Sequence, residues 1–312
     1  MVNSLSISAL AAGTALCLVL GANNIAICIG TTMSSRTLRY KQAVLIAAVG
    51  LMAGAVLEGG KMSQTVAGVA PTLSDAALLA ATIAAFAVMA LVTWLRIPLS
   101  MNQVFVGAVV GATLARAGVV DVPYTGLVIT SWLLTPVAGL VAATLISLVT
   151  RTVARRIRRI ILLNKAYAWL TIVTGFYASY ALGANGIGLV AGASNTLPQL
   201  RPWVVLGMAA AAVAGMALFG RGTTRSVAEN IVGLNMPAAM AAQLGGAMVV
   251  HGFTQVGMPV SSTQAVVGGV FGAAAPRKLV VQNSRLIREL ILGWSAAPLV
   301  GAIIAFALAS VL

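Results

Sequence analysis

The chain has 312 residues, of which 60% are hydrophobic and only 8% are charged, so it is far more apolar than an ordinary soluble domain. This composition predicts a membrane protein that crosses the bilayer several times. A net charge of +14 would fit a nucleic-acid-binding protein if the cations gathered on one face among aromatic residues. They are instead scattered through short loops between apolar stretches, so we exclude nucleic acid as a partner.

The first apolar stretch lies near the N-terminus and contains both cysteines of the chain. Because no Lys or Arg precedes Arg36, this segment lacks the charged start of a cleaved leader, and we expect a retained first helix. Cys17 and Cys28 lie in an apolar span and have no metal-ligand spacing. The sequence therefore predicts neither a disulfide nor a metal site.

Apolar spans follow one another along the chain in two groups of five. The first group covers residues 5–33, 42–58, 74–95, 97–115 and 123–150. After the basic stretch RTVARRIRR at 151–159, the second group covers residues 163–195, 204–219, 236–252, 258–275 and 290–312. The pattern predicts an all-α polytopic membrane protein with a first repeat at 1–150, a basic cytoplasmic linker at 151–165 and a second repeat at 166–312.

An internal register supports this duplication. Gly21, Trp132 and Pro136 each recur as the same residue type 162 residues later. The sequence IPLSMNQVFVGAVVG, which begins at residue 97, matches MPVSSTQAVVGGVFG, which begins 161 residues later. Four anchors at nearly one offset predict two copies of one unit.

The loop charges predict how the two repeats enter the membrane. An odd number of crossings per repeat forces the second copy to insert upside down relative to the first. With the N-terminus outside, only Lys61, Arg116 and Arg201 fall in external loops, and the other sixteen of the nineteen Lys and Arg residues fall on the cytoplasmic side. We therefore expect inverted-topology repeats in a multi-pass protein of the cell membrane, with both termini external and the 151–165 loop cytoplasmic.

Two pairs of polar motifs interrupt the apolar spans. GANN at 21–24 and GANG at 183–186 place asparagines at membrane depth, where non-helical backbone must be buried or face an aqueous cavity. PLSMNQ at 98–103 and PVSSTQ at 259–264 resemble helix N-termini that bind an anion. The alternatives are polar contacts between helices and ordinary capping by a serine. Together the motifs predict broken or re-entrant half-helices around a site at the membrane midplane.

The residues from 21 onward, GANNIAICIGTTMSSRTLRYKQAVLIAAVGLMAGAVLEGGKMSQTVAG, resemble the first repeat signature of the inorganic phosphate transporter (PiT) family. GMPVSSTQAVVGGVFG together with GWSAAPLVGAI resembles the second signature, so the resemblance spans nearly the whole chain. It implies a secondary transporter for a tetrahedral oxyanion, driven by a cation gradient and assembled as a homodimer. By position it implies substrate-binding roles for Asn23, Asn24, Ser100, Asn102, Gln103, Asn185, Ser261, Ser262, Thr263 and Gln264.

The chain departs from the family's GAND motif, because Asn24 and Gly186 occupy the positions of its two acidic residues. Phosphate near neutral pH keeps a P–OH hydrogen that an acidic acceptor would bind, whereas sulfate offers acceptor oxygens only. The missing carboxylates resemble the family's sulfate permease branch. We therefore expect sulfate as substrate and a proton rather than sodium as coupling ion, with phosphate and sodium, met by backbone carbonyls and asparagines, as the alternative.

Only five acidic residues are available to bind a coupling proton. Three of them fall at external span ends or beside arginines, where solvated faces and helix pairing explain them. Glu58 closes the second span and Glu229 lies in the matching region of the second repeat, and both are candidates for coupling, with an ion pair to Lys or Arg as the alternative. We expect His251, the only histidine, to be an interfacial hydrogen-bonding residue.

Other functional classes fit the sequence less well. An intramembrane enzyme needs a nucleophile with a base, or a constellation of carboxylates and metal, and the sequence contains neither. A channel can also use broken helices and inverted repeats, so it stays open as a less favoured class. We expect no cofactor besides the coupling ion.

Overall fold

The computed structural model describes residues 4–34, 37–95, 97, 99–194, 201–230, 235–277 and 284–312, and every regular element in these ranges is a helix. The first half contains α1 (Ser4–Ser34), α2 (Tyr40–Glu58), η1 (Gly59–Met62), α3 (Thr65–Val69), α4 (Asp75–Trp94), α5 (Met101–Ala115) and α6 (Val122–Arg156). The second half contains α7 (Ile160–Leu182), η2 (Gly183–Ile187), α8 (Gly188–Ala193), α9 (Arg201–Asn230), α10 (Met236–Gln255), α11 (Ser262–Ala274), η4 (Ala275–Arg277) and α12 (Ser284–Ala309). Arg36, Arg96 and Lys278, which the loop-charge argument used, lie outside the described residues.

The predicted all-α, multi-span class is confirmed. Within the described ranges, the segments long and apolar enough to cross a membrane are Ser4–Gly30, Tyr40–Val69, Asp75–Trp94, Val122–Arg156, Ile160–Ala193, Arg201–Gly222 and Ile291–Ala309. The helices α5 and α11 differ, because their 15 and 13 residues extend only about 22 and 20 Å. A bilayer core is about 30 Å thick, so both are half-helices, as predicted for the two hairpins.

Long helices pack through glycines that bring their backbones into direct contact. A methyl group on Gly21 in α1 would lie 1.9 Å from the carbonyl oxygen of Ala212 in α9. One on Gly183, next to α7, would lie 2.0 Å from the carbonyl oxygen of Leu51 in α2. Glycine is the residue that allows such close helix approach. The pairs α1–α9 and α2–α7 therefore make the same kind of contact, and each pair joins one half of the chain to the other.

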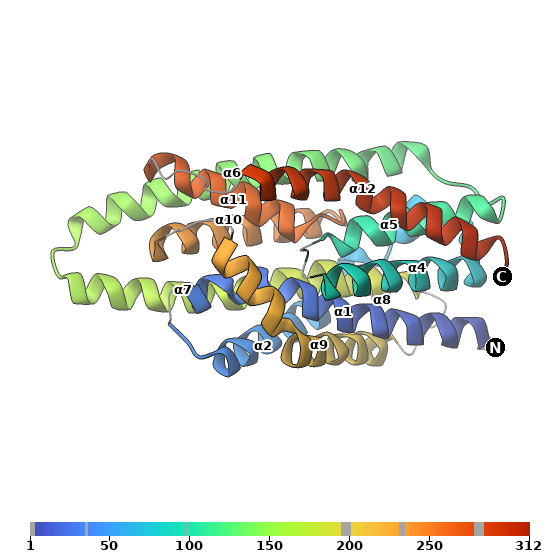
Figure 1. The fold of residues 1–312 in the computed structure, drawn as a ribbon, viewed down its shortest axis with the longest axis horizontal. Coiled ribbons are helices and arrows are strands. Elements are labelled where there is room, and N and C mark those ends of the chain that lie inside the picture. Colours follow the sequence, from blue (N-terminus) through green and yellow to red (C-terminus); the bar gives the residue numbers. More distant parts are fainter. Residues whose placement is uncertain are drawn as a thin grey trace.

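The half-helices α5 and α11 also make equivalent glycine contacts in the two repeats. Gly107 of α5 packs on Pro298 of α12, where an added methyl would lie 2.1 Å from the carbonyl oxygen, and Gly268 of α11 packs on Pro136 of α6 at 2.0 Å. Figure 1 shows α1 and α7 running in opposite directions along the long axis, as do α6 and α12. These contacts support the internal duplication, and the opposite directions fit the inverted orientation, which stays a prediction.

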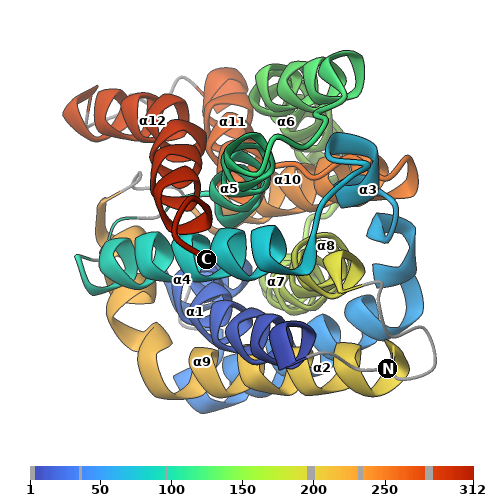
Figure 2. The same cartoon turned by 90° about the vertical axis from the view of Figure 1, so that its right-hand side faces the viewer.

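The helix α5 lies inside the protein and packs against α4 and α12, as Figure 2 shows. Its Val104, Phe105 and Ala108 are fully buried. Because most of α5 beyond its first turn is apolar around the whole helix, burial is its favourable state. The N-terminal end of α5 is thereby held deep in protein, away from the molecular surface.

Residues 151–165, expected as a basic linker, contain the last turns of α6, three non-helical residues at 157–159 and the first turns of α7. The arginines Arg151, Arg155, Arg156, Arg158 and Arg159 are exposed there. Figure 1 shows this connection at one end of the long axis, where α6 turns back into α7.

Candidate functional site

The N-terminal ends of α5 and α11 meet inside the protein. Asn102, in the first turn of α5, donates a hydrogen bond of 2.8 Å to the carbonyl oxygen of Val260, two residues before α11 begins. Ser100 and Ser261 cap the two helices, since their hydroxyls accept from the backbone N–H three residues later at 3.5 and 3.2 Å. The capping alternative is thus correct for both serines. The positive ends of two helix dipoles also point into one region.

Asn185 joins this region to a local break after α7. Its Oδ1 accepts from Asn102 Nδ2 at 2.6 Å, and its Nδ2 donates to Thr254 Oγ1 at 2.8 Å and to the carbonyl oxygen of Met258 at 3.1 Å. Asn185 is fully buried and lies in η2, which is a π-helix. Such π segments appear frequently at functional sites. The predicted departure from α-helical geometry at GANG is confirmed.

Asn23 makes the equivalent contacts in the first repeat. Its Nδ2 donates to Thr93 Oγ1 at 3.0 Å and to the carbonyl oxygen of Ile97 at 3.1 Å, and its Oδ1 accepts from Leu99 N at 3.4 Å. The prediction that GANN breaks the first helix was wrong, because α1 continues through residues 21–24. Gly21 serves the close contact with α9 instead of a turn, and Asn23 ties α1 to the segment that precedes α5.

A small polar cavity lies between the two half-helices. Its volume of about 10 Å³ is that of a single water molecule. Asn24, whose Nδ2 donates to the carbonyl oxygen of Leu20 at 3.3 Å, lies at one side. The cavity is lined by Leu20, Asn24, Ser100, Met101, Asn102, Leu182, Val260 and Ser262. Four residues expected from the resemblance therefore share this cavity, and Asn185 is bonded to one of them.

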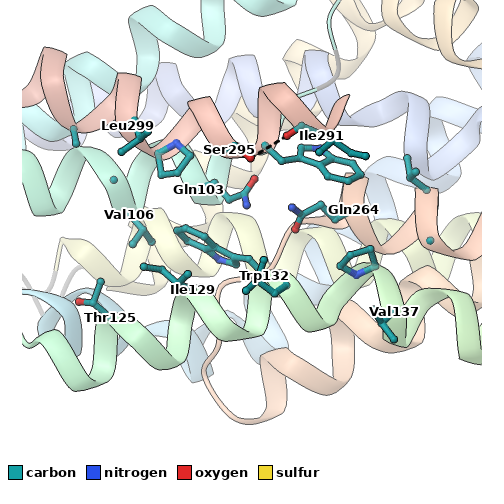
Figure 3. Close-up of a pocket in the computed structure, with 18 of the residues that line it drawn as sticks. Gln103, Val106, Thr125, Ile129, Trp132, Val137, Gln264, Ile291, Ser295 and Leu299 are labelled. Carbon is teal, nitrogen blue, oxygen red and sulfur yellow. Dashed lines mark hydrogen bonds between the residues drawn. The ribbon is translucent and has the colours of Figure 1, made fainter. Parts of the chain in front are cut away.

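Gln103 and Gln264 point elsewhere, into a mostly apolar cavity of about 750 Å³ between α5, α6, α11 and α12. Figure 3 shows the two amides facing each other across it, with Trp132 beside them. The Oε1 atoms of both glutamines and the Oγ1 of Thr263 are buried without a hydrogen-bond partner among the described residues. Gln103 therefore lies on another face of α5 than Asn102, because successive residues of a helix point about 100° apart, and the substrate-binding role of the ten residues stays a prediction.

Glu58 lies at the end of α2 in a cluster that the sequence did not reveal. Its Oε2 is 2.8 Å from His251 Nε2, 2.6 Å from Gln255 Nε2 and 3.6 Å from Lys61 Nζ. The predicted pairing of Glu58 with a lysine is confirmed, but His251 is a closer partner. The side chain of Glu229 lies outside the described residues. Within the described part of the chain, no group of three or more His, Cys, Asp and Glu could hold a metal ion.

The fold and these contacts define a polytopic helical membrane protein with a polar site between two buried helix ends. A family model described as the phosphate transporter family matches residues 20–305, so the chain belongs to that family.

Three individual proteins illustrate the similarity. A protein named as a phosphate permease in Methanocaldococcus jannaschii is 27% identical over 92% of this chain and 91% of its own length. One named as a low-affinity inorganic phosphate transporter in Bacillus subtilis is 25% identical over 88% of this chain and 87% of its own. The solved structure of a sodium-dependent phosphate transporter matches with a TM-score of 0.84 over 99% of both chains at 21% identity, which shows the shared fold.

Proposed function

We propose that the protein is a secondary active transporter that imports inorganic phosphate across the cell membrane by cation symport. Family membership and the names of the relatives support this proposal. The observation that carries it is the meeting of the N-terminal ends of α5 and α11 at a small polar cavity. Helix N-termini with hydroxyl and amide donors bind an oxyanion without a fixed positive charge.

Substrate binding in this proposal requires movement. The cavity holds about one water molecule, and a tetrahedral oxyanion is several times larger. We propose that the anion replaces the hydrogen bonds from Asn102 to Asn185 and Val260, and that these groups turn toward the substrate. Asn24, Ser100 and Ser262, which line the same cavity, complete the proposed site.

Sulfate is the second candidate substrate, because Asn24 and Gly186 stand where the family's motif has acids. A methyl group on Gly186 would already lie 3.1 Å from the side chain of Leu20, so this position has little room for a longer side chain. Val260 lines the cavity and its carbonyl oxygen accepts from Asn102, and a carbonyl can likewise accept the P–OH hydrogen of phosphate. Together with the names of the relatives, this reasoning favours phosphate over the sulfate expected from sequence.

The coupling ion is part of the same proposal. We favour a proton over sodium, because the carboxylates of the GAND motif are absent and Glu58 and Glu229 are among the few acids that can bind a proton. Sodium held by backbone carbonyls and asparagine oxygens is the alternative. The sodium dependence named for the solved structure belongs to that protein.

Uptake into proteoliposomes tests the substrate, the coupling ion and the class together. Labelled phosphate is offered with unlabelled phosphate, sulfate, thiosulfate or molybdate as competitors, under an imposed proton or sodium gradient. We expect saturable phosphate uptake driven by the proton gradient, with weak competition by sulfate. Stronger competition by sulfate than by phosphate would favour the second candidate. Unitary currents would indicate a channel, and a chemically changed product inside the vesicles would indicate an enzyme.

Membrane orientation and assembly are further proposals. With Cys17 and Cys28 replaced, single cysteines at positions 3 and 155 are labelled from outside in sealed cells. We expect labelling only at position 3, because the basic stretch at 151–159 favours the cytoplasm. Equal labelling of both positions from outside would contradict inverted repeats. The homodimer implied by the family resemblance is tested by the mass of the purified protein in detergent.

A further inference from the structure

A second polar cluster lies where α2, α7 and α10 meet, and the phosphate proposal names only its Glu58, as one candidate for the coupling proton. We propose that Glu58, His251 and Tyr177 form a proton-binding site whose occupancy is coupled to anion binding at the candidate site. This inference rests on the proposed function, and it names the side chains through which a proton acts. His251 is the chain's only histidine, and Glu58 is one of only five acids.

Both nitrogens of the His251 ring have a partner. Nε2 is 2.8 Å from Glu58 Oε2, and Nδ1 is 2.7 Å from the hydroxyl of Tyr177. Because an ionised carboxylate only accepts hydrogen bonds, we assign the hydrogen of the neutral ring to Nε2 and the acceptor role to Nδ1. An added proton binds at Nδ1. The Tyr177 hydroxyl then rotates from donor to acceptor, and the bond to Glu58 stays in place.

The groups around the ring bring charges of both signs. The titratable groups facing it are Glu58 from α2 and Tyr177 and Tyr180 from α7, and Lys61 from η1 lies beside Glu58. With Glu58 and Lys61 ionised and the ring neutral, the cluster has no net charge, and one proton gives it a single positive charge. Imidazole is the side chain whose charge ordinarily changes between about pH 5 and 8. The side chains of His251 and Glu58 are 24% and 21% exposed, so water reaches them.

The three helices that carry the cluster, α2, α7 and α10, also contact or adjoin the π-helix η2. His251 lies one turn before Thr254, which accepts the hydrogen bond of Asn185. Tyr177 lies in α7, within two turns of the π segment Gly183–Ile187. Beyond Glu58, the backbone at Gly59 touches Gly188, where an added methyl would lie 2.6 Å from the Gly59 carbonyl oxygen.

Asn185 in turn is bonded to Asn102 at the candidate site, at 2.6 Å. A change of charge at His251 therefore acts on elements that position a proposed anion ligand. Coupling of this kind is reciprocal, so a proton that favours anion binding must itself bind more tightly when the anion is present.

The single histidine makes a direct test possible. The full chain, labelled with ¹³C and ¹⁵N in its histidine ring, is reconstituted in lipid nanodiscs and titrated by NMR with and without saturating phosphate. We expect phosphate to shift the midpoint of the ring titration by about 0.7 pH unit or more, which corresponds to the roughly fivefold coupling at the lower end of the range typical of linked sites. An identical midpoint in samples where phosphate binding is demonstrated would overturn the inference.

Variants provide a second measurement. Phosphate affinity is measured at two pH values in the wild type, in His251→Gln and in Tyr177→Phe. Phosphate itself ionises between these pH values, but this effect is the same in every variant and cancels in the comparison. We expect His251→Gln to change the pH dependence at least threefold, and Asp75→Asn, which removes an acid outside the cluster, to leave it unchanged. An unaltered pH dependence in His251→Gln would contradict the inference.

Failure of the proposed function gives a different result. If the wild-type protein binds sulfate but not phosphate, the same titrations are run with sulfate, and the inference holds or fails on them. If neither anion binds at any pH, both the proposed function and this inference are wrong.

Discussion

The two repeats agree in the contacts that hold the half-helices and differ in the contacts that surround the candidate site. Asn23 bonds Thr93 and the carbonyl oxygen of Ile97 in the first repeat, and Asn185 bonds Thr254 and the carbonyl oxygen of Met258 in the second. Each pair of counterparts is separated by 161 or 162 residues. Conserved geometry across the two copies therefore identifies the parts that build the fold.

The differences are concentrated at three places. The chain is α-helical at GANN and a π-helix at GANG, and Asn102 of the first hairpin corresponds to Thr263 of the second. Glu58 and His251 have apolar residues at the matching positions, 219 or 220 for Glu58 and 90 for His251. A feature that is present in only one repeat is not required for a repeat to fold. We therefore expect function to depend most on these unshared features.

The shared glycine contacts give the largest predicted effect. Gly21→Ala and Gly183→Ala each place a methyl within 2.0 Å of a carbonyl oxygen on a neighbouring helix. Helices must separate to admit it, so we expect each variant to lose about 3 kcal/mol of stability or to fail to fold. Gly126→Ala is the control, because nothing lies within 4 Å of an added methyl there. Thermal unfolding in detergent compares the three, and unequal losses for Gly21 and Gly183 would break the equivalence of the repeats.

Substitution of Asn102, whose counterpart in the second hairpin is Thr263, gives the next largest predicted effect. Asn102→Ala removes the bonds to Asn185 and Val260, so we expect phosphate affinity to fall tenfold or more. Thr263→Val removes a buried hydroxyl that has no partner among the described residues, and we expect a smaller, few-fold loss if that hydroxyl meets the anion. Equilibrium binding of labelled phosphate to folded protein measures both. A larger loss in Thr263→Val than in Asn102→Ala would reverse the roles of the two hairpins.

Substitution of Asn23 distinguishes fold from function. Its amide is fully used by Thr93, Ile97 and Leu99, so Asn23→Ala leaves buried partners unsatisfied. We expect a loss of about 1–3 kcal/mol in stability. Phosphate affinity of the folded fraction should change less than in Asn102→Ala. Thermal unfolding and binding, measured on the same sample, separate the two effects, and a fall in affinity without a fall in stability would assign Asn23 to the site.

Hydropathy and the repeat offset predicted the helices well, because burial in lipid demands long apolar runs and duplication leaves matching residues at one spacing. The same reasoning failed at GANN, since glycine promotes both chain turns and close helix contact, and the partner helix decides between them. The contact of Glu58 with His251 joins residues 193 positions apart, so no local pattern announces it. The family resemblance grouped Gln103 and Gln264 with the site, and no local pattern shows that their side chains line another cavity.

These glutamines give the smallest predicted effect and the sharpest contrast with the family-based expectation. Both side chains are buried in the cavity between α5, α6, α11 and α12, and each Oε1 lacks a hydrogen-bond partner among the described residues. An unpartnered buried polar atom costs about 1–3 kcal/mol, and an apolar group of similar shape removes this cost. We therefore expect Gln103→Leu and Gln264→Leu each to raise stability by about 1 kcal/mol while phosphate affinity stays within twofold of the wild type. Thermal unfolding and phosphate binding check the two statements independently. A strong loss of affinity in both variants would return the glutamines to the substrate site and would mean that the larger cavity, rather than the smaller one, receives the anion.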